Sequence, residues 1–511
     1  MLVQIQLDHP HEHYTNLDLI AGKVILKAPN PSNISSIIVK LEGESRTRLM
    51  AAVRPDRPDK QRPVLEVHKF LYKAQVVLPQ DTSLEDLKEN PKVVVPMGAG
   101  QFEYPFEFKI PLNTSCLQQN SLTTNVSFAN MIPEYAKSPT QHVKTTLPPS
   151  ISGFPGEAEI RYFVKVTVNR PQFFKENPRA MAHFTMLPIE PPRAKAADGE
   201  AYARRTHQFI EGSPNQSAGK RRSWFDKKET SGSPTREKTS AITPRVSVDA
   251  RLPNPALLTL NHDIPLRVLI KNMSERSKNI YLQMLQIELI GYTKVRAHEV
   301  TRTESNSWIL SSLSNMAIPI GSTTDPVGTE IPINPEYWAG NLIPNTVAPS
   351  FQACNLSRFY ELEVRVGLGY GSYKHGEDQL VVLPLRLPVK VYSGIAPPQA
   401  LLEAAVKKVK RDFKAEPYIA SNLQPQLQQQ QQQQQQEPAH AQTNNARPQT
   451  PTHQQGLAGA TASSPPGYDD APPSYEEAVG ASLPPIMGYR GSYMPPPVPE
   501  GAPRFSEDRK R

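Results

Sequence analysis

Alternation of apolar and polar residues with a period of two is the feature that most limits what this 511-residue chain can fold into. Apolar side chains at every second position give a β-strand one buried and one exposed face, and they fit no α-helix. Such runs fill two blocks, residues 1–192 and 246–393, and neither block has a comparable helical stripe. The apolar faces of the clearest runs are Phe102, Tyr104, Phe106, Phe108 and Ile110; Ile160, Tyr162, Val164, Val166 and Val168; Ile264, Leu266, Val268 and Ile270; Leu362, Val364, Val366 and Leu368; and Val381, Leu383, Leu385, Leu387, Val389 and Val391. The pattern predicts an all-β protein made of two β-sandwiches in tandem.

Two details refine this prediction. The polar face of the last run carries Pro384 and Pro388, which suit an edge strand because proline has no N–H to donate to a neighbour. The pair Pro149-Ser150 precedes the run with Tyr162, and Pro349-Ser350 likewise precedes a run with Tyr360. This repetition indicates that the two sandwiches are related to each other.

The segment between the two blocks, residues 193–245, carries most of the positive charge. It holds 12 Lys and Arg against 6 Asp and Glu, a balance of +6 within a chain total of +8. Its Ser, Thr, Gly and Pro content predicts a disordered basic insert. Ser223 follows two arginines, and three other hydroxyl residues precede proline, so phosphorylation would cancel the charge. The candidate phosphosites are Ser213, Ser223, Ser233 and Thr243.

The tail, residues 394–511, is rich in proline and contains an uninterrupted glutamine run at 428–436. Such composition predicts disorder with extended, polyproline II segments. An amphipathic helix is expected near 399–414, where apolar residues recur at helical spacing beside four basic residues. This helix would lie on an anionic membrane surface or dock back on the folded body.

The strongest short motif lies within this tail. Residues 465–471 read Pro-Pro-Gly-Tyr-Asp-Asp-Ala, and residues 472–478 repeat them as Pro-Pro-Ser-Tyr-Glu-Glu-Ala. Pro-Pro-x-Tyr binds WW domains: the prolines lie in an aromatic groove as a preformed polyproline II helix, and the tyrosine fills a neighbouring pocket. Two copies in register predict a WW-domain binding site. Its residues are Pro465, Pro466, Tyr468, Pro472, Pro473 and Tyr475.

The strand pattern also resembles the arrestins. Residues 22–26, 37–43 and 100–111, with Pro148-Pro149-Ser150 before 160–166, resemble strands of an arrestin N-terminal lobe. Residues 264–272, 287–292 and 383–392 resemble strands of a C-terminal lobe. The resemblance implies the arrestin fold, with an N-terminal sandwich at 1–192 and a C-terminal sandwich at 246–393.

An arrestin-like body with tandem Pro-Pro-x-Tyr motifs resembles the α-arrestins, known in fungi as arrestin-related trafficking adaptors. The resemblance implies a non-enzymatic adaptor without a cofactor. It would recruit a WW-domain HECT-type ubiquitin ligase to a membrane transporter or receptor, whose ubiquitination would lead to endocytosis. It implies a cytoplasmic protein found peripherally at the plasma membrane and endosomes. Only the six motif residues are carried over from the family.

Other functions are excluded or kept as alternatives. The chain has no Gly-rich phosphate loop, H-E-x-x-H or G-x-S-x-G motif, and no folded basic face for nucleic acid. Cys116 and Cys354 are too few and too distant in sequence to predict a disulfide framework or zinc site, and His9–His13 is expected to be an exposed polar turn. The N-terminus lacks an export signal, which predicts a soluble protein in a reducing compartment. The alternatives are a signalling scaffold linking a membrane sensor to endosomal machinery and a nuclear WW-binding co-regulator.

Overall fold

The computed structural model describes most of the two predicted blocks and short parts of the tail. The described residues are 1–8, 11–54, 57–89, 93–116, 142–152, 157–172, 176–193, 198–209, 244–274, 280–322, 324–371, 379–404, 479–480, 482–486 and 490–495. The chain divides into two units, one comprising Met1–Ala396 with Pro484–Arg511 and the other Pro397–Leu483. The first unit contains both sandwiches, and we call its residues 1–396 the body.

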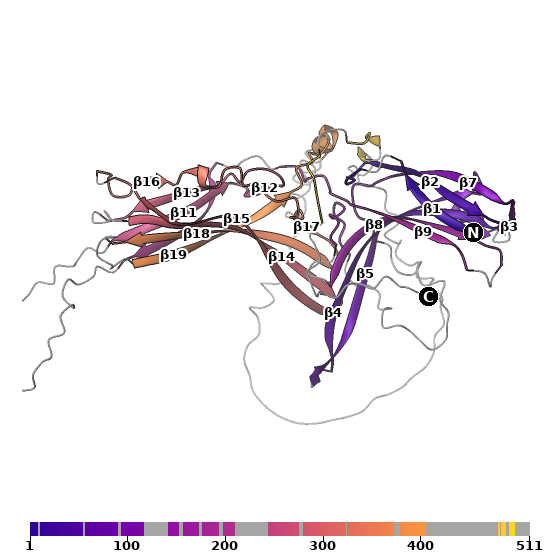
Figure 1. The fold of residues 1–511 in the computed structure, drawn as a ribbon, viewed down its shortest axis with the longest axis horizontal. Helices are drawn as coiled ribbons and strands as arrows, with labels where there is room; N and C mark the ends of the chain where they lie inside the picture. The colour runs from indigo at the N-terminus through magenta and orange to yellow at the C-terminus, as the bar shows by residue number, and fades with distance from the viewer. Residues whose placement is uncertain are drawn as a thin grey trace, which may run out of the picture. The chain divides into compact units, whose positions relative to one another are not determined.

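The N-terminal lobe is built from two antiparallel sheets and a short strand pair (Figure 1). One sheet has the order β1-β2-β7, the other β5-β4-β8-β9, and β3 pairs with β6. The bounds are β1 Leu2–Leu7, β2 Leu19–Ala28, β3 Ser32–Ile34, β4 Ser36–Arg54, β5 Arg57–Leu78, α1 Leu84–Glu89, β6 Val95–Met97, β7 Gly100–Lys109, β8 Ala158–Asn169 and β9 Arg179–Phe184. The inward residues of both sheets form one apolar core, which also takes in Val295, Ala297, Ala348 and Leu356 of the second lobe.

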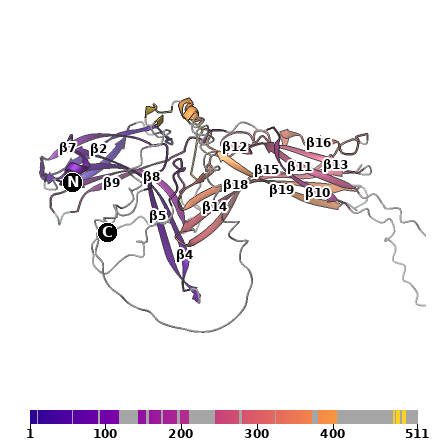
Figure 2. The ribbon, with the colours of Figure 1, turned by 180° about the vertical axis from the view of Figure 1, so that it is seen from behind.

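The C-terminal lobe likewise has two sheets, ordered β10-β11-β13-β16 and β12-β19-β18-β14-β15, and β17 pairs with β18 (Figure 2). The bounds are β10 Glu200–Gln208, β11 Arg245–Pro253, β12 Leu257–Thr259, β13 Arg267–Asn272, β14 Ile280–Ala297, β15 Val300–Pro319, β16 Glu330–Pro332, η2 Pro335–Tyr337, β17 Phe351–Gln352, β18 Leu356–Tyr370 and β19 Gln379–Tyr392. The predicted all-β fold of two sandwiches is confirmed.

The alternating runs account for most of these strands. Along β7 the exposed face contains Pro105, and the strand is at the edge of its sheet. Along β19, Leu383, Leu385 and Leu387 are buried, whereas Pro384 and Pro388 are exposed. Residues 379–389 pair only with β18, since β12 joins at Lys390–Tyr392, so this stretch is the predicted edge. The run beginning at Ile264 differs slightly, because the strand starts only at Arg267.

The predicted repetition extends to individual contacts. The hydroxyl of Tyr162 donates to the carbonyl of Pro148 at 2.6 Å, and that of Tyr360 donates to Ala348 at 2.5 Å. Ser150 and Ser350 each exchange two hydrogen bonds with a neighbouring strand end, at Met186 and Val391 respectively. The same local arrangement therefore closes both sandwiches.

Three segments qualify the expected boundaries. Glu200–Gln208 lies in the segment predicted as a disordered insert, yet it forms β10, paired along its length with β11. Residues 399–404 of the predicted amphipathic helix are helical, and the rest of it lies outside the described residues. Residues 490–495, within the predicted disordered tail, contact the body. Among the described helices none has the length and apolar character needed to cross a bilayer.

Candidate functional site

The residues predicted from sequence to carry function cannot be located in this structure. The predicted WW-binding residues Pro465, Pro466, Tyr468, Pro472, Pro473 and Tyr475 lie outside the described residues. The candidate phosphosites Ser213, Ser223, Ser233 and Thr243 do so as well. What the structure describes is where the chain returns to the body after the motifs, and how the two lobes meet.

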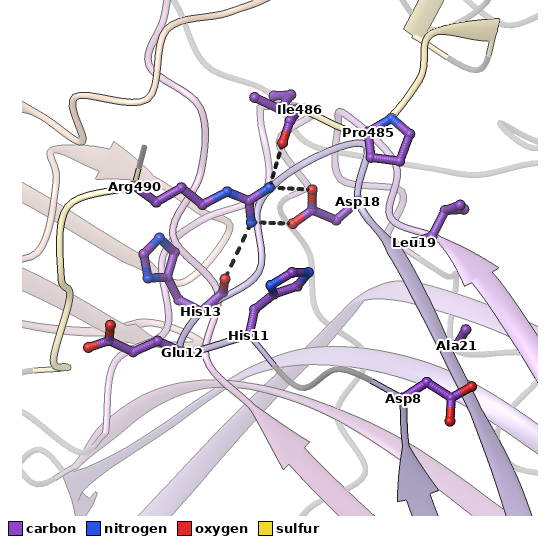
Figure 3. A pocket seen from close by; sticks show the side chains of 10 residues that line it. All are labelled: Asp8, His11, Glu12, His13, Asp18, Leu19, Ala21, Pro485, Ile486 and Arg490. Carbon is purple, nitrogen blue, oxygen red and sulfur yellow. Dashed lines mark hydrogen bonds and ion pairs between the residues drawn. The ribbon is translucent and has the colours of Figure 1, made fainter. Parts of the chain in front are cut away.

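The chain returns to the body through an ion pair. Both terminal nitrogens of Arg490 contact the carboxylate of Asp18, at 2.7 and 2.8 Å (Figure 3). Arg490 also donates to the carbonyl of Ile486 at 2.8 Å, so its guanidinium is bound both by the body and by its own segment of the tail. The carboxylate of Asp18 is almost fully buried and the guanidinium largely so, which makes this bidentate contact stronger than an exposed pair.

Asp18 is held in place by a compact turn before β2. Its carboxylate accepts the backbone N–H of Thr15 at 2.8 Å, and Leu17 adopts a left-handed backbone conformation with φ of 71°. The Asn16 side chain donates to the carbonyl of Leu112 and accepts from the backbone of Ile189. Side chains of this kind stabilise turns by bonding to nearby backbone groups. The anchor for Arg490 is therefore part of the N-terminal lobe itself.

The residues after Arg490 continue onto both lobes. Tyr493 is buried, and its hydroxyl donates to the carbonyl of Ser150 in the N-terminal lobe at 2.7 Å. Burial raises the pKa of Tyr493. Ser492 accepts hydrogen bonds from Asn345 and from Asn261, both in the C-terminal lobe. We call residues 490–495 the docked segment.

A pocket of about 580 Å³ lies beside the Arg490–Asp18 pair, lined also by His11, His13 and Glu12 (Figure 3). His13 is buried, so the expectation of an exposed turn at His9–His13 is wrong for this residue, although His11 and Glu12 are exposed. Among the described residues, neither ring nitrogen of His13 has a hydrogen-bond partner. Burial and then the charge of Arg490 lower the pKa of His13. Burial and the charge of Arg490 therefore favour the neutral form of His13 beside the ion pair.

The two lobes meet where β4 approaches β14 and β15 and where β5 approaches β14 (Figures 1 and 2). Asn355, just before β18, is buried and bridges to Ser45 at 2.6 Å and Thr47 at 3.0 Å. The Thr47 hydroxyl also donates to the backbone carbonyl of Arg296 at 2.5 Å. Buried polar groups that are paired across an interface favour one geometry, because separation would leave them unsatisfied.

Glu66 on β5 is the charged centre of this interface. Its carboxylate contacts Arg296 at 2.9 Å, accepts the backbone N–H of His298 at 2.5 Å, and lies 2.6 Å from Nε2 of His68. Burial opposes ionisation of Glu66, but the hydrogen bonds from His68 and His298 and the charge of Arg296 outweigh it, so its pKa is lowered. Burial also opposes the charged form of His68, but hydrogen bonds to Cys354 and Glu66 raise its pKa.

The two cysteines meet at the same interface. Their Sγ atoms lie 3.8 Å apart, although 238 residues separate them, so their distance in sequence was misleading. His68 and His142 complete a group of four side chains that could hold a metal ion. The hydrogen bond from Cys116, together with His68, lowers the pKa of Cys354, while that bond and burial raise the pKa of Cys116.

Sequence reasoning missed these residues because none belongs to a local motif. Arg490 and Asp18 are 472 positions apart, and Ser45 and Asn355 are 310 apart. Arg490 and Tyr493 lie in a tail end that also contains other arginines and a second tyrosine, so no local pattern marks them as the residues that contact the body.

Comparison with family models gives a match within the N-terminal lobe. Residues 3–122 match the family model described as "Arrestin (or S-antigen), N-terminal domain". This region is similar to the arrestin N-terminal domain, in agreement with the sandwich observed.

Two curated relatives are more specific. The chain is 32% identical over 130 residues to Arrestin-related trafficking adapter 10 of Lachancea thermotolerans, covering 23% of this chain and 29% of the relative. It is 23% identical over 206 residues to the protein of the same name from Eremothecium gossypii, covering 36% and 45%. The chain thus spans less than half the length of each relative. The resemblance to arrestin-related trafficking adaptors is confirmed.

Proposed function

We propose that this protein is a non-catalytic trafficking adaptor that recruits a WW-domain ubiquitin ligase of the HECT type to membrane transporters or receptors. In this role the body binds the cargo, the tail binds the ligase, and the cargo is ubiquitinated and internalised. The protein works in the cytoplasm and at the surfaces of the plasma membrane and endosomes.

The tandem Pro-Pro-x-Tyr-acid-acid-Ala sequence is the observation that carries the proposal. Each copy supplies the two prolines and the tyrosine that a WW groove binds. The second copy is seven residues from the first, so a dissociated ligase can rebind at an effective concentration on the order of millimolar. The acids after each tyrosine favour association with a basic rim on the partner.

The docked segment supports the proposal that a ligase bound at the motifs stays close to cargo bound at the body. The chain that carries them is continuous with the body at Ala396, and after the motifs Arg490 pairs with Asp18 of the body. A ligase bound at Tyr468 or Tyr475 is consequently linked to the body on both sides. This linkage raises its effective concentration at a cargo bound to the same body.

The basic insert supports regulation by phosphorylation. Gln208 and Arg245 are paired at the ends of β10 and β11, so the insert between them connects two adjacent strands. Phosphates at Ser213, Ser223, Ser233 and Thr243 would cancel this positive charge. Contact with anionic membranes or acidic cargo tails would then weaken.

A pull-down with the full chain tests ligase recruitment. The double variant Tyr468→Ala with Tyr475→Ala is expected to lose WW-domain ligases from the bound fraction, because the tyrosine pocket is left empty. Tyr418→Ala is the matched control, since Tyr418 lies in the same tail after a single proline and is expected to change nothing. Equal ligase capture by the double variant would refute the proposal.

Internalisation of transporters tests the output. Cells carrying the double variant should retain at the surface at least one transporter that wild-type cells internalise, and its ubiquitination should fall. Normal ubiquitination and uptake of every transporter, with ligase capture still lost, would favour the signalling scaffold. Constitutive nuclear residence would exclude trafficking.

A further inference from the structure

Four side chains with metal-binding atoms converge at the lobe interface. His68 lies on β5, Cys116 follows β7, His142 lies in the segment before β8, and Cys354 lies in the turn between β17 and β18. Their ligand atoms all lie within 4.8 Å of one another. Three come from the N-terminal lobe and one from the C-terminal lobe.

The spacing of these atoms fits a tetrahedral centre. Zn–S bonds of about 2.3 Å and Zn–N bonds of about 2.0–2.1 Å, at tetrahedral angles, place two sulfurs about 3.8 Å apart and a sulfur and nitrogen about 3.5 Å apart. The Sγ atoms of Cys116 and Cys354 lie 3.8 Å apart, and Nδ1 of His68 lies 3.5 Å from Sγ of Cys116. One ion at the centre would reach all three atoms at ordinary bond lengths.

The surroundings of the cluster are those that a metal site requires. Nε2 of His68 lies 2.6 Å from the Glu66 carboxylate, which orients the ring and leaves Nδ1 free to face the sulfurs. The backbone N–H of Val143 donates to Sγ of Cys354 at 3.3 Å. Arg296 contacts both Glu66 and the carbonyl of Cys354, at 2.9 and 2.8 Å. Charges balance, since two thiolates neutralise a divalent ion and Arg296 neutralises Glu66.

We propose that His68, Cys116, His142 and Cys354 form a structural zinc site that joins the two lobes. A Cys₂His₂ set in tetrahedral spacing selects Zn²⁺, and four protein ligands leave no open position for catalysis. Binding releases the thiol protons to solvent as both cysteines become thiolates. This site is independent of the proposed adaptor function.

A disulfide between the cysteines explains the cluster less well. An S–S bond is about 2.05 Å long, and it would need neither histidine. The buried His68, its carboxylate partner and the approach of His142, whose ring centroid lies 5.3 Å from that of His68, all follow from a metal site.

Metal content of the full chain tests the proposal. Protein purified under reducing conditions with Zn²⁺ present, then desalted, is expected to retain about one zinc per chain by mass spectrometry of the metal. Cys354→Ser and His142→Asn should each lower zinc affinity at least about 10-fold, since each removes a ligand. His207→Asn, on β10 away from the interface, is the control and should retain zinc. His142 is exposed, so its variant tests the site even where Cys354→Ser fails to fold.

Cobalt reports the geometry directly. Co²⁺ in place of Zn²⁺ should give the intense visible absorption of a tetrahedral ion with a thiolate charge-transfer band, both lost in Cys354→Ser or, where that variant is unfolded, in His142→Asn. Zinc retention by the wild type no higher than by these variants would overturn the proposal, as would octahedral Co²⁺ spectra. A Cys116–Cys354 disulfide that persists in reductant and excludes metal would also overturn it.

The outer shell offers a finer test. Glu66→Gln keeps a hydrogen-bond acceptor but removes the charge facing His68, and it should weaken zinc affinity about 10–100-fold. Chelation of the wild type should accelerate hydrogen exchange on both sides of the joint, around Glu66 and around Asn355. Unchanged exchange on chelation would show that any bound ion does not join the lobes.

Discussion

The two lobes share a contact between a glycine and a tyrosine on neighbouring strands, but they differ in the buried residue beside that tyrosine. Gly43 of β4 pairs with Tyr162 of β8, and Gly291 of β14 pairs with Tyr360 of β18. A Cβ at either glycine would lie 2.9 Å or less from the tyrosine ring, so the ring packs over the missing side chain. Close approach of this kind is a positional reason for glycine within a strand.

Two residues before each tyrosine, the lobes diverge. The N-terminal lobe has the buried apolar Ile160, and aromatic rings of Phe70 and Phe184 surround Tyr162. The C-terminal lobe has the fully buried Arg358 at the equivalent position. The difference teaches that the glycine–tyrosine contact sets the backbone, while the space beside it accepts either an apolar or a charged side chain.

Arg358 is held by a complete set of partners. It donates to the hydroxyls of Tyr360 and Thr293 at 2.6 Å and to the Asn306 side chain at 2.7 Å. Its guanidinium also lies 5.4 Å from the Trp308 ring centroid, within cation–π range. Such a network is costly to disrupt, because each partner is left without its donor.

The largest effect is expected from replacing the buried residue two positions before each tyrosine, which is Arg358 in the C-terminal lobe and Ile160 in the N-terminal lobe. Arg358→Leu should reduce the free energy of unfolding of the C-terminal lobe by about 3–5 kcal/mol, because it leaves buried oxygens without donors. The matched Ile160→Leu keeps volume and polarity and should cost less than about 1.5 kcal/mol. Hydrogen exchange resolved by peptide measures each lobe separately. Equal losses would mean that the Arg358 network adds nothing beyond packing.

The glycines should be sensitive to a similar degree. Gly43→Ala and Gly291→Ala are each expected to cost about 1–3 kcal/mol, because the new methyl overlaps side chains at 2.8–3.0 Å. Gly98→Ala is the control, since a Cβ there meets nothing within 4 Å. An unchanged free energy of unfolding for one of the two variants would show that the glycine–tyrosine contact is not equivalent in the two lobes.

Removing the tyrosine hydroxyls sharpens the contrast at smaller scale. Tyr162→Phe loses one hydrogen bond and should cost about 1 kcal/mol, whereas Tyr360→Phe also leaves an Arg358 donor unpaired and should cost about 2 kcal/mol. Thermal unfolding combined with exchange measures both. Indistinguishable losses would show that Arg358 finds another acceptor.

Acid titration should give the smallest difference, with opposite signs. Hydrogen bonds from Arg204 and Arg251 outweigh burial and lower the pKa of Asp249 below its usual 3.8, so stability present at neutral pH is lost as pH falls through that depressed pKa. Burial raises the pKa of Glu159 above 4.5, so its protonation on acidification favours the folded state. Asp249→Asn should therefore lower the free energy of unfolding at pH 7, whereas Glu159→Gln should not lower it. Each change should be smaller than about 1 kcal/mol. Denaturant titrations at pH 7 and pH 3 test the signs, and identical pH dependence in wild type and Asp249→Asn would contradict them.

The sequence predicted those strands whose own residues alternate between buried and exposed positions. The alternation of β19 and its exposed prolines identified both a strand and an edge, because the type of each residue indicates whether its side chain is buried or exposed. Strand β10 lacks that signal, since its sequence EAYARRTHQ is largely polar and is ordered by pairing with β11 and by the Arg204–Asp249 ion pair. The cluster around Cys354 and the Arg490–Asp18 pair depend on long-range folding, which no spacing rule in one sequence encodes.

The docked segment also changes how the protein would respond to a protease. Because the chain is attached to the body both before residue 397 and from residue 490, one cut between these points divides the polypeptide but leaves both fragments on the body. A cut before Pro465 leaves the proposed WW-binding motifs on the fragment held by Arg490 and Tyr493, and a cut after Tyr475 leaves them on the other. Release of these motifs from the body would take two cuts, one on each side of them.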